Sequence, residues 1–242
     1  MSSINSKLNT SFWNEYFRLY DILNKVYPYQ DLLKSVMAEM DLRQGSAVLD
    51  AGAGTGNLAV LIAKTGAEVV GLDSSEVGLE IFKKKLPASK AILHDLEHPI
   101  PFPNNSFDYI CSINTLFAID SVHREKICRE FYRLLKPKGK LIMTNLSEGY
   151  KPIRIYLAHI REEIKRFGFQ KAIVNLARII GPTIKMFYYN RKMVKEGDSS
   201  SGLNLFASGD QEFLLKNSGF SDVSKEQRLF AGQAVLNSGF KV

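Results

Sequence analysis

Short runs of apolar, often β-branched residues alternate with helix-like stretches through the middle of the chain. Five runs are predicted as strands: Ala47–Ala51, Glu68–Leu72, Ala91–Leu93, Phe107–Ile113 and Lys140–Asn145. The stretches Asn57–Lys64, Ser75–Lys84 and Val122–Leu134 between them are predicted as helices. Strands that are apolar throughout and alternate with helices indicate a parallel sheet covered on both faces. Right-handed crossovers make such a sheet doubly wound.

Both ends of the chain carry further elements. Asn9–Leu42 has aromatic and apolar residues at helical spacing, which predicts two helices broken near Pro28. Near the other end, the predicted helix Gly209–Asn217 is followed by two β-like runs, Asp222–Phe230 and Gln233–Lys241. Their close spacing predicts a hairpin.

The segment 148–205 interrupts the alternation. Its first helix has one apolar face, expected to contact the core, made by Ile153, Tyr156, Leu157, Ile160, Ile164 and Phe167. Arg154, Arg161 and Lys165 share a flank of that helix. A second helix, Ala172–Ile180, is predicted to end at Gly181-Pro182, and Asp198–Gly202 is predicted as a flexible link.

Length and composition narrow the class of protein. The 242 residues correspond to one large domain or a core with a subdomain, at about 100–200 residues per domain. The 45% hydrophobic and 24% charged residues are typical of a globular chain. Without an export signal or a long apolar run, we expect a cytoplasmic protein. Cys111 and Cys128 are expected to be reduced, and no residue spacing indicates a metal site.

The positive charge is concentrated in one segment. Between Lys151 and Lys195 there are eleven Lys and Arg against two Glu, whereas the whole chain carries a net charge of +7. All of the excess positive charge therefore belongs to Lys151–Lys195, which makes that segment a candidate contact for an acidic partner.

One motif carries the chemistry. Val48–Gly56 reads VLDAGAGTG, an apolar strand that ends in Asp50 and leads through three glycines to a helix. Glycines let the backbone approach a ligand at a helix N-terminus. The dinucleotide fingerprint requires G-x-G-x-x-G, but this motif is G-x-G-x-G followed by Asn57, which disfavours a nicotinamide oxidoreductase.

Asp73 follows the second strand, 17 residues after Gly56. A carboxylate at that strand end can accept both hydroxyls of a ribose. Asp73 can equally serve as a helix N-cap, because Asp73-Ser74-Ser75 also begins a helix.

These residues resemble the class I S-adenosylmethionine-dependent methyltransferases. Besides the glycine motif, the similar stretches are VVGLDSS, HDLEHPIPFPNNSFDYI, FYRLLKPKGKLIMTN and AGQAVLNSGFK. The resemblance covers about Ser46–Asn145 and Gly209–Lys241. It implies an α/β fold with a doubly wound seven-stranded, mostly parallel sheet, a C-terminal antiparallel hairpin, N-terminal helices and a helical insertion.

The resemblance also implies roles for single residues toward S-adenosylmethionine. Gly52, Gly54 and Gly56 would pass close to its methionine part, with Asp50 holding the turn and the amino group. The remaining implied contacts are Asp73 with Ser74 at the ribose, Asp95 with Leu96 at the adenine, and Asn114 on the methyl-donor side. Asp95 can alternatively be a plain loop carboxylate.

Methyl transfer requires mainly alignment and desolvation, so no catalytic residue is demanded. Should a base assist, the candidates are Tyr20, Tyr16 and His123, each of which can equally be a packing or surface residue. The basic segment 148–205 has three open interpretations. It can be a solvated lid, a lid over an acidic or amphiphilic acceptor with peripheral contact to an anionic membrane, or a nucleic-acid contact through Phe187–Lys192.

We therefore expect a single methyltransferase domain: a helical cap (1–44), a Rossmann-like core (45–147 and 206–242) and a basic lid (148–205). The expected reaction is methyl transfer from S-adenosylmethionine to N or O of a small-molecule or lipid-like acceptor, leaving S-adenosylhomocysteine. The alternatives are a non-catalytic donor-binding or membrane-binding protein and an RNA methyltransferase. The sequence does not identify the acceptor or the oligomeric state.

Overall fold

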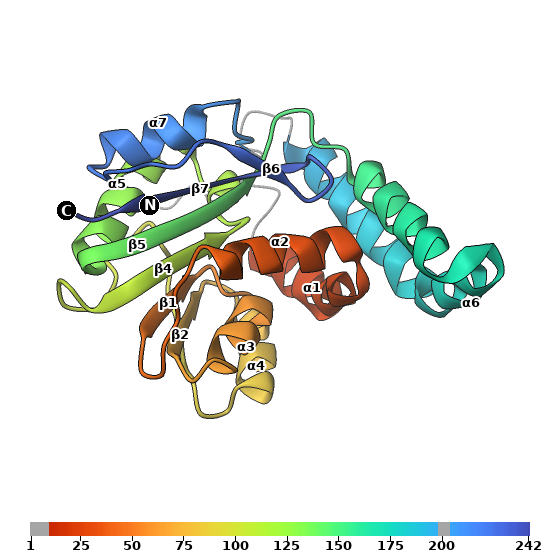
Figure 1. Ribbon diagram of the computed structural model, residues 1–242, viewed down its shortest axis with the longest axis horizontal. Coiled ribbons are helices and arrows are strands. Elements are labelled where there is room, and N and C mark those ends of the chain that lie inside the picture. The colour runs from red at the N-terminus through yellow and green to blue at the C-terminus, as the bar shows by residue number, and fades with distance from the viewer. Residues whose placement is uncertain (1–9, 198–203) are drawn as a thin grey trace.

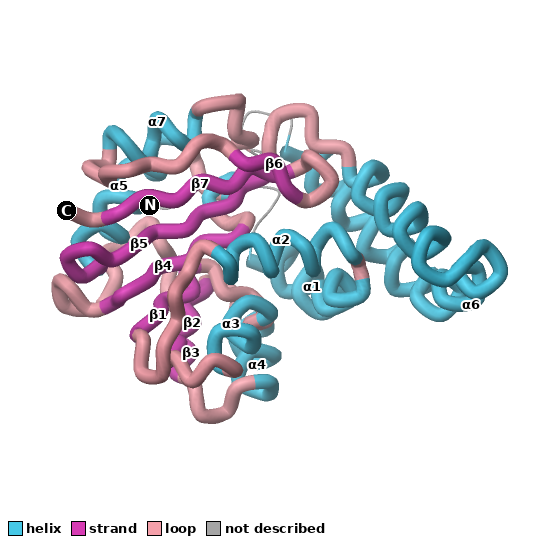
Figure 2. Tube along the Cα trace, in the orientation of Figure 1, coloured by secondary structure: helices cyan, strands magenta, loops and turns pink. Residues whose placement is uncertain are grey.

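The computed structural model describes residues 10–197 and 204–242. Within them, one sheet contains the strands β1 (Ala47–Ala51), β2 (Glu68–Asp73), β3 (Lys90–Leu93), β4 (Phe107–Ile113), β5 (Leu135–Leu146), β6 (Gln227–Leu229) and β7 (Ala234–Phe240). The strand order is β3-β2-β1-β4-β5-β7-β6 (Figure 2). β1 to β5 pair in parallel, whereas β7 pairs antiparallel with both β5 and β6. The predicted fold class is confirmed.

Helices connect the strands in two directions from the centre of the sheet. The helices outside the insertion are α1 (Thr10–Tyr20), α2 (Tyr27–Ala38), α3 (Asn57–Ala63), α4 (Glu76–Lys85), α5 (Ser121–Leu134) and α7 (Asp210–Asn217). The chain runs from β1 through α3 to β2, but from β4 through α5 to β5 on the other side. Right-handed crossovers in opposite directions place their helices on opposite faces. The carboxyl ends of β1 and β4 thus border a crevice where ligands of such sheets bind.

The core elements end close to the predicted residues, with three differences. The predicted run Asp222–Phe230 is a strand only over Gln227–Leu229. The N-terminal helices are separated by the 3₁₀ turn η1 (Asp21–Lys25), and Pro28 lies inside the first turn of α2. Proline is tolerated there because the first turn has no N–H partner to lose. β5 begins at Leu135 instead of Lys140, because Leu135 also pairs with Phe107.

The insertion forms α6 (Pro152–Gly197), which is broken at Gly168, a residue with φ 75° and ψ 165°. Its two arms lie side by side and project from the body beyond α1 (Figure 1). We call them the first arm (152–167) and the second arm (169–197), and together the α6 hairpin. The predicted stop at Gly181-Pro182 is wrong. The helix continues through Pro182 because Ile179 and Met186, on either side, are buried and hold the second arm in place.

The predicted apolar face of the first arm is also wrong in its main point. Of its six residues only Tyr156 is buried, whereas Ile153, Leu157, Ile164 and Phe167 are 38–47% exposed. The side of the first arm that faces the body includes two polar residues, His159 and Glu163. Both are buried, and both lie beside Tyr27 of α2. The predicted link Asp198–Gly202 lies outside the described residues.

Candidate active site

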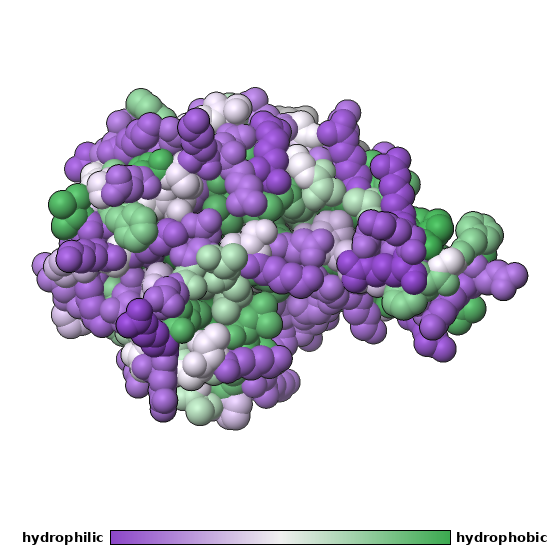
Figure 3. Space-filling view, viewed as in Figure 1, coloured by the Kyte–Doolittle hydropathy of each residue, from purple (hydrophilic) through white to green (hydrophobic). Residues whose placement is uncertain are grey.

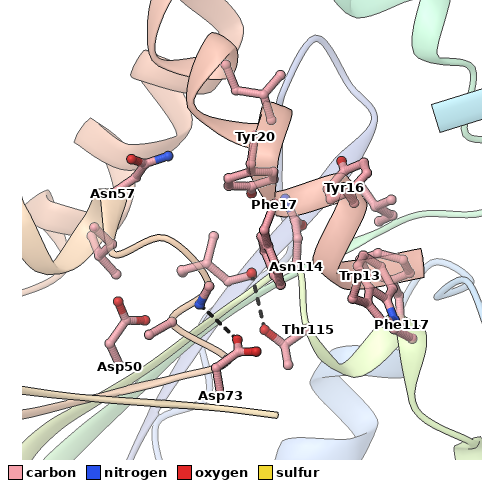
Figure 4. Close-up of a pocket in the computed structure, with 18 of the residues that line it drawn as sticks. Trp13, Tyr16, Phe17, Tyr20, Asp50, Asn57, Asp73, Asn114, Thr115 and Phe117 are labelled. Atoms are coloured by element: carbon pink, nitrogen blue, oxygen red, sulfur yellow. Dashed lines mark hydrogen bonds between the residues drawn. The ribbon is translucent and has the colours of Figure 1, made fainter. Parts of the chain in front are cut away.

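A cavity of about 570 Å³ lies at the carboxyl ends of β1, β2 and β4. One side, which we call the polar half, is lined by Asp50, Gly52, Ala53, Gly54, Asp73, Ser74, His94, Asp95, Leu96, Glu97 and Asn114. The other side, the aromatic half, is lined by Trp13, Tyr16, Phe17, Tyr20, Tyr29, Phe117, Tyr150, Tyr156 and Phe230. Figure 4 shows the row Trp13, Phe17 and Tyr20 of α1 across the cavity from Asp50 and Asp73.

The glycine loop turns between β1 and α3 with positive φ at Gly52 (83°), Gly54 (50°) and Gly56 (76°). A Cβ at Gly52 would lie 2.2 Å from Thr115 Oγ1, and one at Gly54 would lie 2.6 Å from the Phe17 ring. Gly52 and Gly54 line the cavity. Gly56 does not, since it caps α3 and packs against Phe82.

Asp73 anchors this loop from the neighbouring strand. Its Oδ2 accepts a 2.8 Å hydrogen bond from Gly54 N, and its Oδ1 accepts one from Ser75 N. Burial raises the pKa of Asp73, against the lowering effect of these backbone N–H groups. The N-cap of α4 is Ser75, whose hydroxyl accepts a hydrogen bond from Gly78 N. The residue that caps this helix is therefore Ser75, two positions after Asp73, and not Asp73 itself.

Asp50 lies at the end of β1 and is only 2% exposed. Its Oδ2 has no hydrogen-bond partner among the described residues. Burial, with a further contribution from the nearby Asp73 carboxylate, raises the pKa of Asp50 to about 7. Burying a carboxylate oxygen without a hydrogen-bond partner costs free energy. A cation that binds next to the carboxylate offsets this cost.

The other predicted cofactor contacts also border the cavity. Asp95 is half-exposed and its Oδ1 accepts a hydrogen bond from Glu97 N, while Leu96 beside it is buried. Asn114 follows β4 with φ 50° and is held by the bond from its N–H to Thr144 O. The structure thus brings Asp50, Asp73, Asp95 and Asn114 from four strand ends to one cavity.

The aromatic half is closed by helices from distant parts of the chain. Tyr16 of α1 donates its hydroxyl hydrogen bond to Asn190 Oδ1 of α6 at 3.0 Å, and Asn190 Nδ2 donates to the Tyr156 hydroxyl. At the polar half, Asn14 of α1 accepts a hydrogen bond from the Ser75 hydroxyl. α1 is therefore a wall that both halves of the cavity share.

The tyrosines predicted as candidate bases lie in this wall as neutral phenols. Burial raises the pKa of Tyr16 and of Tyr20 well above 10, and that of Tyr156 to about 12. Near neutral pH they can donate hydrogen bonds but do not take up a proton. Among the described residues that line the aromatic half, none is a titratable base at neutral pH.

The third candidate base, His123, is not among the residues that line the cavity. It lies at the start of α5, where its Nδ1 is 3.1 Å from Glu97 Oε2. Of the aromatic rings in Phe187–Lys192, that of Tyr188 is 62% exposed and the others pack against the protein, so the nucleic-acid interpretation stays a prediction. The Tyr189 ring packs on Phe12, the Phe187 ring packs on Tyr156, and Asn190 is buried.

Sequence reasoning missed several cavity residues. Thr115, Phe117, Tyr150 and Asn190 were not singled out as site residues, yet all four line the cavity. Thr115 and Phe117 follow β4 directly and are deducible from the strand-end rule. The position of Asn190 depends on how the α6 hairpin folds back, for which the sequence holds no local signal.

Comparisons with known proteins identify the kind of domain and fold. Residues 49–143 match a family model described as a methyltransferase domain. Demethylmenaquinone methyltransferase of Staphylococcus aureus is 25% identical over 232 residues, 92% of this chain and 88% of the relative. Demethylmenaquinone methyltransferase of Shouchella clausii is 28% identical over 148 residues, and the match spans 62% of its length and 57% of this chain.

Solved structures share the fold. A SAM-dependent methyltransferase from Thermotoga maritima superposes with a TM-score of 0.61 at 20% identity, covering 96% of this chain and 98% of that one. One from Aquifex aeolicus gives 0.57 at 17% identity, covering 92% and 93%. Residues 49–143 form a methyltransferase domain, and the fold and glycine loop are similar to those of class I S-adenosylmethionine-dependent methyltransferases. The protein is an enzyme, and its methyl donor is S-adenosylmethionine.

Proposed function

We propose that this methyltransferase acts on a small amphiphilic acceptor with a ring system, bound in the aromatic half of the cavity. The observation that carries the proposal is the division of one cavity into a polar and an aromatic half. A ring and an apolar tail are stabilised by stacking and by burial against the aromatic wall. The relatives named demethylmenaquinone methyltransferases support a quinone-like acceptor.

The polar half fits the methyl donor. Asp50 would face its ammonium group, because Oδ2 is a buried acceptor that has no partner in the described part of the chain. Asp73 and Ser74 would hold the ribose, Asp95 and Leu96 the adenine, and the loop at Gly52 and Gly54 the methionine part. When bound, the donor would supply a methyl group on a sulfonium: a lone pair of the acceptor bonds to the methyl carbon while the carbon–sulfur bond breaks and the thioether S-adenosylhomocysteine leaves.

The protein contributes alignment and exclusion of water. α1 covers the loop at Gly54, since the Phe17 ring lies where a Cβ of that residue would be. Fixing two reactants in a dry cavity is worth roughly 7–11 kcal/mol of the barrier. Because the aromatic half lacks a base, the N or O acceptor atom predicted from the sequence must present its lone pair without help from Tyr16 or Tyr20.

The test is acceptor preference. Purified enzyme is incubated with S-adenosylmethionine and either a quinol with a short isoprenoid tail or a polar amine such as histamine, and S-adenosylhomocysteine is quantified. We expect kcat/KM for the quinol to be at least 100-fold higher. Equal rates, or a preference for the amine, would reject the amphiphilic acceptor while leaving the class of enzyme intact.

A further inference from the structure

We propose that the α6 hairpin docks the enzyme on an anionic lipid surface, lying in the headgroup region without crossing the bilayer. Apolar side chains, coloured green in Figure 3, gather at the far end of this hairpin. None of the described helices is long and apolar enough to cross a membrane. The inference rests on the proposed amphiphilic acceptor for its purpose, but its evidence is the surface of the hairpin itself.

The first arm presents an apolar stripe away from the body. Ile153 and Leu157 precede Ile155 and His159 by two residues each, which is about 200° around a helix. Ile155 and His159 are buried, with His159 against Tyr27 of α2. Ile153 and Leu157 are 47% and 45% exposed, so they lie on the far side from the body.

The second arm has an exposed apolar stripe as well. Phe169, Ile173, Ile180 and Ile184 follow one another at intervals of four and seven residues, which keeps them on one side of the helix. All four are 52–65% exposed. Tyr189, nine residues after Ile180 and so about 180° around the helix, packs on Phe12 of α1. We name these exposed apolar residues of the two arms the outer stripe: Ile153, Leu157, Phe169, Ile173, Ile180 and Ile184. Exposed apolar residues that are grouped, instead of scattered singly, mark an interaction surface.

Positive charge borders the outer stripe. Arg154, Arg161 and Lys165 are exposed on its first-arm flank, and among the described residues no carboxylate pairs with them. Long basic side chains beside an apolar helix face can reach phosphate groups while their stems stay in the interface. Anionic lipid is therefore the complementary occupant. A second copy of this chain would bring two hairpins with ten Lys and Arg each into contact.

Docking would also orient the cavity. Ile155, Tyr156 and Asn190 of the α6 hairpin line its aromatic half, so the element that contacts lipid also forms part of the acceptor wall. A bilayer-dissolved acceptor would reach the cavity along this hairpin.

The test is co-sedimentation with vesicles of phosphatidylcholine alone or with 30% phosphatidylglycerol, without donor or acceptor. We expect wild-type protein to bind only the anionic vesicles. The variant R154E/R161E/K165E should lose at least about 100-fold in partitioning, because each cation near such a surface is worth about 1 kcal/mol. The variant F169S/I173S/I180S should also lose binding through its smaller apolar area.

Matched controls carry the same changes on the body. K64E/K84E/K138E reverses three exposed charges, and V122S/F213S/V242S removes three exposed apolar side chains. Both should bind anionic vesicles like the wild type. All four variants should bind S-adenosylhomocysteine normally in calorimetry, which shows that they are folded.

Several outcomes would overturn the proposal. The proposal is wrong if wild-type protein does not bind anionic vesicles, or if the control variants lose as much vesicle binding as the hairpin variants. It is also wrong if the hairpin variants lose S-adenosylhomocysteine binding. Light scattering that shows a dimer dissolved by F169S/I173S/I180S with vesicle binding intact would assign the outer stripe to a second copy. Tighter binding to polyuridylate than to vesicles would assign the charge to RNA. None of these results bears on the acceptor-preference test, so the two proposals fail separately.

Discussion

At the scale of residues, Asp50 and Asp73 lie at neighbouring strand ends but differ in their hydrogen bonds. Both carboxylate oxygens of Asp73 accept hydrogen bonds from backbone N–H groups, whereas Oδ2 of Asp50 has no partner within residues 10–197 and 204–242. Both positions were predictable, because an acid at the end of a buried strand lies at the carboxyl edge of the sheet. Which of the two stays unpaired was not, since that depends on how the glycine loop closes over Asp73.

The first prediction concerns Asp73. Replacing it with alanine removes the acceptor of Gly54 N and the proposed ribose contact, so S-adenosylhomocysteine binding should weaken by about 1.5–3 kcal/mol in calorimetry. Asp108→Ala is the matched control, because Asp108 also accepts a backbone N–H in the same sheet, from Ala47, but does not line the cavity. Unchanged affinity in Asp73→Ala would remove Asp73 from the donor site.

The second prediction concerns Gly54. Gly54→Val strains a residue with φ 50° and drives a branched side chain into the Phe17 ring, so donor binding should be lost while the far-UV spectrum stays native. Gly45→Val is the control: its φ is 79°, but no atom lies within 4 Å of its Cβ. If both variants bind S-adenosylhomocysteine like the wild type, the loop does not contact the donor.

The third prediction is a pH dependence at Asp50. The pKa of about 7 in the folded protein lies above the unfolded value of about 3.9, so protonation favours the fold. The stability from this group is complete below about pH 4 and is lost as the pH rises to 7. Donor binding needs the ionised form, so affinity for S-adenosylhomocysteine should rise about tenfold between pH 6 and 8. Asp50→Asn should show a flat profile; a wild-type profile in that variant would refute the assignment.

At the scale of elements, the core was predictable and the α6 hairpin was not. Strands such as β1 and β4 are buried on both faces, so their sequences are apolar throughout and their ends are visible. In the first arm the predicted apolar residues do share one side of the helix, but that side is exposed. Hydrophobic periodicity identifies one side of a helix without showing what covers it. The buried positions of this arm include His159 and Glu163, whose partner Tyr27 is more than 130 residues away in the sequence.

A fourth prediction tests the proline inside the second arm. Pro182 lacks an N–H and its ring crowds the preceding turn, which costs up to about 3 kcal/mol inside a helix. Pro182→Ala should therefore raise the melting temperature and the helical signal in circular dichroism. Pro152→Ala is the control, because Pro152 is the first residue of α6, where no hydrogen bond is lost. A lower melting temperature for Pro182→Ala would mean that the ring makes contacts that outweigh the missing bond.

At the scale of the whole molecule, charge and donor site are separated. The excess positive charge belongs to the α6 hairpin, whereas the donor site is built from β1, β2 and their loops. Raising the salt concentration should therefore weaken vesicle binding by the α6 hairpin and leave donor binding unchanged. Between 0.05 and 0.5 M NaCl we expect release from anionic vesicles, since exposed charges are screened beyond about 8–10 Å at 0.1–0.15 M. S-Adenosylhomocysteine affinity should change less than twofold in calorimetry; a parallel loss of both would contradict the separation.

The bond between Tyr16 and Asn190 spans 174 residues, and this separation has a consequence during synthesis. The aromatic row of α1 leaves the ribosome long before the second arm that covers it. At about 5–20 residues per second, Phe12 and Tyr16 wait roughly 10–35 s for their partners. During that interval the nascent chain exposes the hydrophobic aromatic residues of α1 after the glycine loop has already been translated. Chaperone binding to this helix while translation proceeds would then decide how much of the newly made protein escapes aggregation.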